Sequence, residues 1–241
     1  MQSQPCFSEI IDRMPTVFAS LLLLWQTQLP TLPTLRFAVP PAAPVNTPFA
    51  GVVVLVAQPG ANGDVQNLSA LASPQPFLDA SAAAVRKWKW TSVTGETNSP
   101  VSVTFFYRAR QILTSAPPTQ FPDWGALETR PPLPQTIFDS GYPVNSVGEG
   151  VVILELRISP QGVVENIRVV QGVPSLTELA ESTVQRWRFT PARNGGDPAT
   201  GIAIVAISFL RPITHLGETD ETACCVCAPV VWRHRFVRTA G

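Results

Sequence analysis

The alternation of apolar and polar residues is clearest between Gly150 and Leu210. Apolar residues at every second position predict a half-buried strand over Gly150–Ser159, and a returning strand is expected over Val163–Gln171. The next segment, Leu176–Trp187, carries apolar residues at helical spacing. A continuous apolar run, Ile202–Leu210, then predicts a closing strand. The predicted order of elements in this segment is therefore β-β-α-β.

The helix of this segment has recognisable boundaries. Ser175 and Glu178 have the spacing of a capping box, in which each side chain accepts a hydrogen bond from the backbone of the other residue. Trp187 and Phe189 follow the helix and are predicted to anchor the core, because large aromatic side chains bury much apolar area. Pro191 is expected to end the element as a further structural anchor.

A weaker version of the same pattern occurs earlier in the chain. It predicts strands over Gly51–Gln58 and Asp64–Ser73, a helix over Phe77–Trp88 and a third strand over Val101–Arg110. Three pairs of residues keep one offset of 99 residues (187 minus 88), namely Trp88 and Trp187, Gly51 and Gly150, and Gly63 and Gly162. We interpret the two patterns as two copies of one small domain, with Trp88 as the counterpart of the anchor Trp187.

We therefore expect an α+β fold with two β-β-α-β modules, each a three-stranded antiparallel sheet with one helix packed on a face. The expected divisions are residues 1–43 as an N-terminal segment with a Pro-rich spacer, 44–111 as the first module, 112–138 as a Pro-rich linker, 139–212 as the second module and 213–241 as a disordered tail. A module of roughly 70 residues buries only about 60% of its unfolded surface, so aromatic anchors or a contact between modules should matter to its stability.

The most apolar part of the N-terminal segment is Val17–Trp25. It is shorter than the roughly 20 residues that a membrane-spanning helix requires. A signal-peptide core or a degenerate anchor has this length, and so does a buried or loosely packed helix. The sequence leaves both interpretations open.

Composition and charge exclude several classes of function. The 241 residues carry no net charge, and charged residues make up 14%, so nothing in the charge predicts binding to nucleic acid. Both histidines, His215 and His234, lie in the tail with three of the four cysteines, Cys224, Cys225 and Cys227, without the spacing of a metal site. We expect no catalytic residues, no metal and no cofactor, and the chain is not predicted to be an enzyme.

The closing strand is the most informative candidate for binding. It carries no charged residue that would discourage pairing, and an exposed edge of a sheet offers unpaired backbone groups to another strand. We predict that a partner peptide is added there, along Ile202, Ala203, Ile204, Val205, Ala206, Ile207, Ser208 and Phe209. The alternative is that this edge pairs with the other module or with a second copy of the chain.

Residues 140 to 211 resemble the C-terminal domain of the energy transducer TonB. The resemblance is carried by Tyr142-Pro143, Gly150-Val151-Val152, Pro160 to Val164, Ala180 to Val184, Trp187 to Ala192 and Ile207-Ser208-Phe209. The first module resembles the family less closely, because Lys89-Trp90-Thr91-Ser92-Val93 stands where the second module has Arg-Phe-Thr-Pro-Ala.

The resemblance implies a periplasmic or cell-envelope protein, associated with the inner membrane where it is anchored. In the family, the domain binds outer-membrane receptors by strand addition to its closing strand, and a membrane helix couples it to the ExbB–ExbD motor. The function implied is partner binding in energy-coupled transmembrane transport across the outer membrane. The alternative is a periplasmic scaffold protein without a transducing role, which uses TonB-like modules to bind another envelope protein and could form a homodimer.

Overall fold

The structure is a computed structural model that describes residues 32–42, 50–72, 75–91, 99–110, 116–125 and 127–212. The predictions for Val17–Trp25 and for the tail with its cysteines and histidines lie outside these residues. The described part is α+β, with the strands and helices β1 (Leu35–Phe37), β2 (Gly51–Pro59), β3 (Val65–Ala72), α2 (Phe77–Val85), β4 (Lys89–Trp90), β5 (Val101–Tyr107), β6 (Thr119–Gln120), β7 (Leu133–Ile137), β8 (Gly150–Ile158), β9 (Val164–Gln171), α3 (Thr177–Val184), β10 (Arg188–Thr190), β11 (Ala192–Asn194), β12 (Asp197–Ala199) and β13 (Gly201–Phe209). We call β1–β5 with α2 the first unit, and β7–β13 with α3 the second unit.

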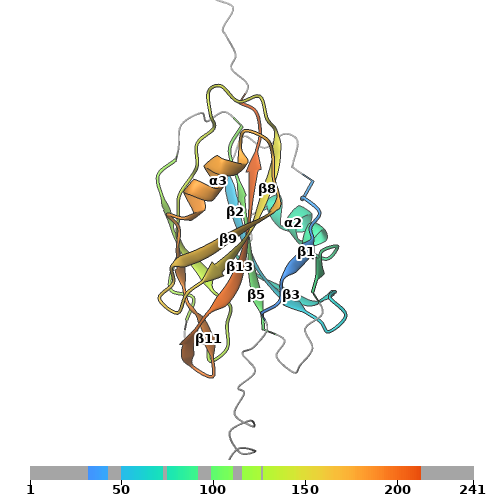
Figure 1. Cartoon of the computed structure of the whole chain (residues 1–241), viewed down its shortest axis with the longest axis vertical. Helices are drawn as coiled ribbons and strands as arrows, with labels where there is room; N and C mark the ends of the chain where they lie inside the picture. The colour runs from blue at the N-terminus through green and yellow to red at the C-terminus, as the bar shows by residue number, and fades with distance from the viewer. Residues whose placement is uncertain are drawn as a thin grey trace, which may run out of the picture.

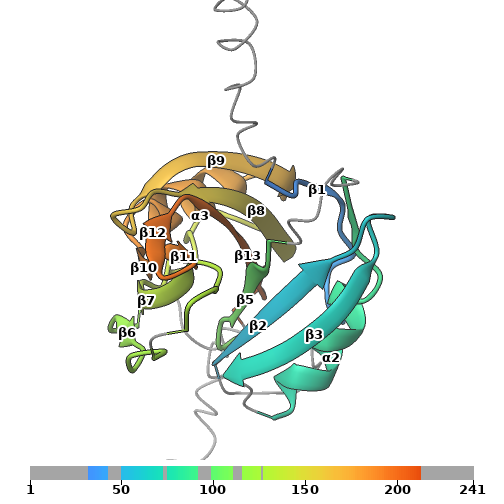
Figure 2. The ribbon, with the colours of Figure 1, turned by 90° about the horizontal axis from the view of Figure 1, so that it is seen from below.

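One six-stranded sheet joins the two units, in the order β3-β2-β5-β13-β8-β9 (Figures 1 and 2). Neighbouring strands are antiparallel except at the centre, where β5 and β13 are parallel. The prediction of two separate three-stranded sheets is therefore wrong. Each unit does supply three strands, but the third strands of the two units pair with each other.

The two helices cover opposite faces of this sheet. The side chain of Ile204 lies in the core that includes Trp88 and residues of α2, whereas the next residue, Val205, lies in the core that includes Trp187 and residues of α3. Successive residues of a strand point to opposite faces, so the two cores lie on the two sides of β13. Figure 1 shows α2 and α3 on either side of the strands. The central strands are apolar on both faces because each face meets a core.

Each unit holds its tryptophan in the same way. The indole Nε1 of Trp88 donates to the carbonyl of Val39 at 2.8 Å, and the Nε1 of Trp187 donates to the carbonyl of Phe138 at 3.0 Å. Both tryptophans are completely buried, so a buried indole N–H has its acceptor in each unit. The acceptor residues lie in the Pro-rich segments that precede each module.

These Pro-rich segments belong to the fold. In the first, β1 pairs with β4, and in the second, β7 pairs with β10 and β6. Leu35 of β1 and Ile137 of β7 are completely or almost completely buried. The interpretation of residues 112–138 as a linker, and of the residues before the first module as a spacer, was therefore wrong for the parts that form these strands.

The predicted capping box is not present. Helix α3 begins at Thr177 without a side-chain cap, and Ser175 has a φ of 67°. The Ser175 hydroxyl instead shares a hydrogen bond of 2.7 Å with the Ser146 hydroxyl, and the Thr177 hydroxyl bonds the backbone of Val173. Pro191 follows β10, so it ends this strand rather than the helix.

Gly162 is a position where only glycine fits. Its φ is +77°, and a Cβ atom there would lie 2.0 Å from the carbonyl oxygen of Phe189. We expect Gly162→Ala to lower the free energy of unfolding by about 2–4 kcal/mol, because strain in φ and a clash with backbone add together. Urea denaturation measures the loss. The matched control is Gly195→Ala, since Gly195 also has a positive φ of +60° but has nothing within 4 Å of its Cβ position. It should cost only about 1 kcal/mol, and equal losses would contradict the clash.

Tyr107 makes stability depend on pH in the alkaline range. Its hydroxyl shares a 2.7 Å hydrogen bond with Ser81, and burial raises its pKa from 10.0 to about 12, although the bond to Ser81 lowers it. The protonated phenol is therefore favoured by folding, and this contribution is present below pH 10 and lost as the pH rises towards 12. Between pH 9 and pH 11, we expect the free energy of unfolding of the Tyr107→Phe variant to fall by about 1 kcal/mol less than that of the unchanged protein. Denaturation at both pH values, with Tyr142→Phe as control, measures it.

Candidate strand-addition interface

The predicted binding strand lies in the interior of the sheet. β13 pairs with β8 on one side and with β5 on the other, where the register runs from Ala203 opposite Ser102 to Ser208 opposite Tyr107. Every residue of β13 is buried. The prediction that β13 is an exposed edge is therefore wrong, and the alternative of pairing with the other module describes the structure. The corrected positions are Ile202, Ala203, Ile204, Val205, Ala206, Ile207, Ser208 and Phe209.

The prediction for β13 was wrong because the absence of charge in a strand has two physical explanations. A strand without charged residues lacks the usual protection of an edge, but it has the composition of a strand covered on both faces. The sequence of β13 fits both descriptions. The pairing with β5 decides between them.

The outer edges of the sheet are formed by β3 and β9. Among the described residues, β3 pairs only with β2, and β9 pairs only with β8. β3 contains neither charged residues nor proline, whereas β9 contains Glu165 and Arg168. Charges on an edge strand discourage the addition of another strand, so β3 is the less protected edge.

A charged pair ties the first unit to the second. Glu155 of β8 and Arg168 of β9 lie opposite each other, with 2.7 Å between Arg168 Nη2 and Glu155 Oε2. Glu155 also accepts the backbone N–H of Leu35 at 2.7 Å, and Arg168 donates to the carbonyl of Leu35 at 2.6 Å. The pair thus binds both backbone groups of one residue of β1, as a neighbouring strand would.

Residues 146–210 match the family model described as Gram-negative bacterial TonB protein C-terminal. These residues are a TonB C-terminal domain. They include β8, β9, α3 and β13, that is, the whole second-unit part of the large sheet. The family consists of energy-transducing and interaction domains without enzymatic activity, and it is periplasmic or part of the cell envelope. Neither the curated proteins nor the solved structures with which the chain was compared gave a match.

The predicted anchors of the TonB C-terminal domain lie where its helix meets the sheet. Trp187 is completely buried and Phe189 is 3% exposed, with their ring centroids 6.3 Å apart. Trp88 occupies the corresponding place on the other face, against Phe105 at 5.8 Å. Pro191 is only partly buried, next to the Gly162 turn.

Glu155 was not predicted to contact the first unit, because the alternation in β8 placed its side chain on the solvent face. The structure buries Glu155 to 8% exposure, since β1 of the first unit covers this face of the TonB C-terminal domain. A signal was present in the sequence. Glu155 and Arg168 are opposite charges on the two strands of a predicted hairpin, as expected for a cross-strand pair.

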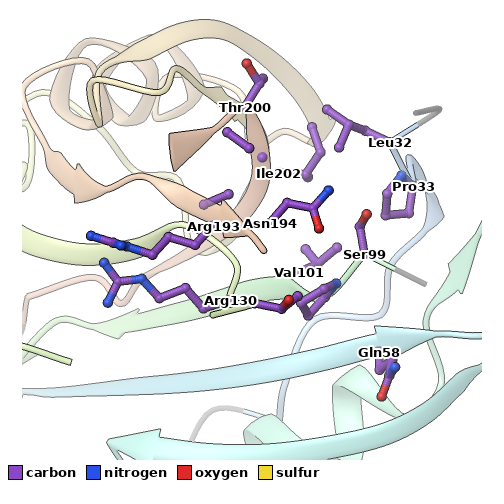
Figure 3. Close-up of a pocket in the computed structure, with 15 residues that line it drawn as sticks. Leu32, Pro33, Gln58, Ser99, Val101, Arg130, Arg193, Asn194, Thr200 and Ile202 are labelled. Carbon is purple, nitrogen blue, oxygen red and sulfur yellow. The ribbon is translucent and has the colours of Figure 1, made fainter. Parts of the chain in front are cut away.

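A cavity of about 390 Å³ lies between the two units at one end of the sheet. Its lining contains no His, Cys, Asp or Glu among the described residues. Arg130 and Arg193 are among the lining residues, and Figure 3 shows their guanidinium groups side by side and directed away from Asn194 and Val101. Burial is the main cause that lowers the pKa of Arg130, and the positive charge of the nearby Arg193 lowers it further. The negative charge of Asp123 acts in the opposite direction. The lining offers no acid–base pair for catalysis.

In the described ranges, no helix has the length and hydropathy needed to cross a membrane. No group of three potential metal-binding side chains occurs in this part of the chain.

We expect Arg168→Met to lower the free energy of unfolding by about 1–3 kcal/mol, because Glu155 stays buried without its cation and the Leu35 carbonyl loses a donor. Urea denaturation of the full chain measures this loss. The matched control is Arg157→Met, because Arg157 and Glu165 lie on the same two strands but are 3.8 Å apart and about half exposed. That pair should contribute less than about 0.5 kcal/mol. Losses of equal size would show that Arg168 does not act through the buried pair.

Proposed function

We propose that this chain is a TonB-family protein of the cell envelope that binds partner proteins by strand addition in energy-coupled transport across the outer membrane. The family match of residues 146–210 is the observation that carries this proposal. The architecture supports it, because the sheet ends in two outer strands that each lie beside a helix, and a segment added to an edge gains backbone hydrogen bonds.

We further propose that the two units are tandem copies of the same domain. Several contacts support this interpretation because they recur at the 99-residue offset. The backbone N–H of Trp90 donates to the Gly63 carbonyl at 2.9 Å, and the N–H of Phe189 donates to the Gly162 carbonyl at 3.1 Å. Opposite pairs in the small sheets follow the same rule, with Leu35 opposite Trp90 and Pro134 opposite Phe189.

In this proposal, β5 occupies the place that a partner strand takes in the family. It runs parallel to β13 over six residue pairs and is wholly buried. A partner would have to displace this strand to reach Ile202–Phe209. Breaking a buried pairing costs the backbone hydrogen bonds and exposes apolar side chains of both cores. Partners are therefore expected at the outer edges of the sheet. Among the described residues, the only strand that takes the partner's place beside β13 is β5.

A scaffold protein without a transducing role is the second candidate. The occupied edge of β13 favours it, since the contact site that the family uses for receptors is filled from within the chain. The scaffold would bind another envelope protein, or a second copy of itself, through the outer strands. The transducer would bind an outer-membrane receptor and an ExbB–ExbD-type motor.

Cell fractionation of the tagged full-length chain in a Gram-negative host tests the proposed function. We expect recovery in the cell envelope, because the family acts there. Retention with the inner membrane, together with chemical cross-linking to the motor, is the result expected of the transducer. Release by osmotic shock is the result expected of the periplasmic scaffold. Recovery in the cytosol, with an envelope protein of the host as the fractionation control, would contradict both candidates.

A further inference from the structure

The outer edge of β3 has an unusual composition for an exposed strand. Its eight residues include no Lys, Arg, Asp, Glu or Pro, and Leu71 is 42% exposed. Soluble proteins usually protect such an edge with charges, proline or a covering segment, because unpaired backbone groups recruit another strand. The other outer strand, β9, carries Glu165 and Arg168 and contacts β1. The two ends of the sheet therefore differ in how open they are to pairing.

A groove runs beside β3 along helix α2. Its volume is about 300 Å³, and its apolar lining includes Leu55, Leu68, Leu78 and Ala82. Leu68 and Leu78 are half-buried and pack against the core of the first unit. In an added strand, every second side chain would point to the α2 side of the sheet and enter this groove. The groove thus offers contacts for side chains next to an edge that offers contacts for backbone.

The charges at this groove are balanced. Asp79 in the first turn of α2 and Arg86 at its C-terminal cap both line the groove and are exposed. The two residues are seven positions apart, which corresponds to about 10 Å along the helix axis. A segment with no net charge, basic near Asp79 and acidic near Arg86, would complement both ends.

The corresponding groove of the second unit has a different character. It lies between β9 and α3, has a volume of about 610 Å³, and includes Glu165, Glu178 and Glu181 but no basic residue in its lining. An apolar or acidic segment would meet three carboxylates there, which disfavours its binding. The groove at α2 is therefore the better receptor for a neutral, apolar strand.

We propose that the groove between β3 and α2 binds an extended, mainly apolar segment of a partner protein with no net charge, as an added strand next to β3. This inference rests on the proposed function and deepens it, because it names the edge that is used and the chemistry of the segment. The backbone of β3 supplies the affinity that does not depend on sequence, and Leu68, Leu78, Asp79 and Arg86 select the side chains.

A fluorescent peptide tests the proposal with the full chain. The probe has the length of β3, eight residues, and alternates Val with Thr between a Lys at one end and a Glu at the other. We expect saturable binding by fluorescence anisotropy, and no binding of a second peptide in which Glu replaces each Val. Ala70→Lys places a charge in the groove on an exposed position and should weaken binding about tenfold or more. Circular dichroism verifies that the variant is folded.

The matched control is Val169→Lys, which places the same charge on β9 at the position 99 residues later, also exposed. It should change the dissociation constant less than about twofold. A second variant, Arg86→Glu on the helix, should weaken the probe severalfold, and a peptide with Lys at both ends should regain binding. This variant leaves β3 unchanged, so its outcome holds even if Ala70→Lys does not fold.

Three results would overturn the proposal. The first is the absence of binding. The second is equal weakening by Ala70→Lys and Val169→Lys. The third is dimerisation of the full chain that Ala70→Lys abolishes, measured by light scattering, because a second copy would then occupy β3. If the chain is recovered in the cell envelope but the peptide fails to bind, the groove is rejected and the proposed function stands. Recovery in the cytosol rejects the function regardless of the peptide.

Discussion

The parallel pairing of β5 with β13 is the interaction on which the rest of the structure depends. Each unit supplies three strands to the large sheet and one helix that covers a single face of them. If a unit stood alone, the other face and the inner edge of its three strands would be exposed to water. The pairing closes both gaps. It covers the inner edges with hydrogen bonds, and it brings each unit against the open face of the other.

Several other features require this arrangement. Glu155 and Arg168 reach the backbone of Leu35 only because β1 of the first unit lies over the second unit. Val151 and Ile153 of β8 are buried in the core that contains Trp88, although both belong to the second unit. Small domains bury a limited fraction of their surface, and sharing a sheet lets two of them bury more than two isolated domains would.

The sequence predicted the local structure well and the assembly poorly. The strands β8, β9 and β13 and helix α3 follow from their periodicity. The union of the two sheets did not follow, because an uncharged strand such as β13 suits a centre and an edge equally. The short strands β1 and β7 were not predicted, because they lie in Pro-rich segments. Their pairing with β4 and β10 is a contact between segments far apart in the chain, which local patterns do not encode. Likewise, the sequence shows that β3 is uncharged, but local patterns do not show that β3 lies at an open edge of the sheet.

The placement of α2 and α3 on opposite faces has a consequence for how many partners the molecule can hold. The two helices lie on opposite faces of the sheet, so the groove beside α2 and the groove beside α3 open to opposite sides of the molecule. One small, rigid partner therefore cannot grip both grooves at once. Two partners could be bound together, each extending the same sheet at its own end. Because the grooves share no lining residue, each can change its selectivity without disturbing the other.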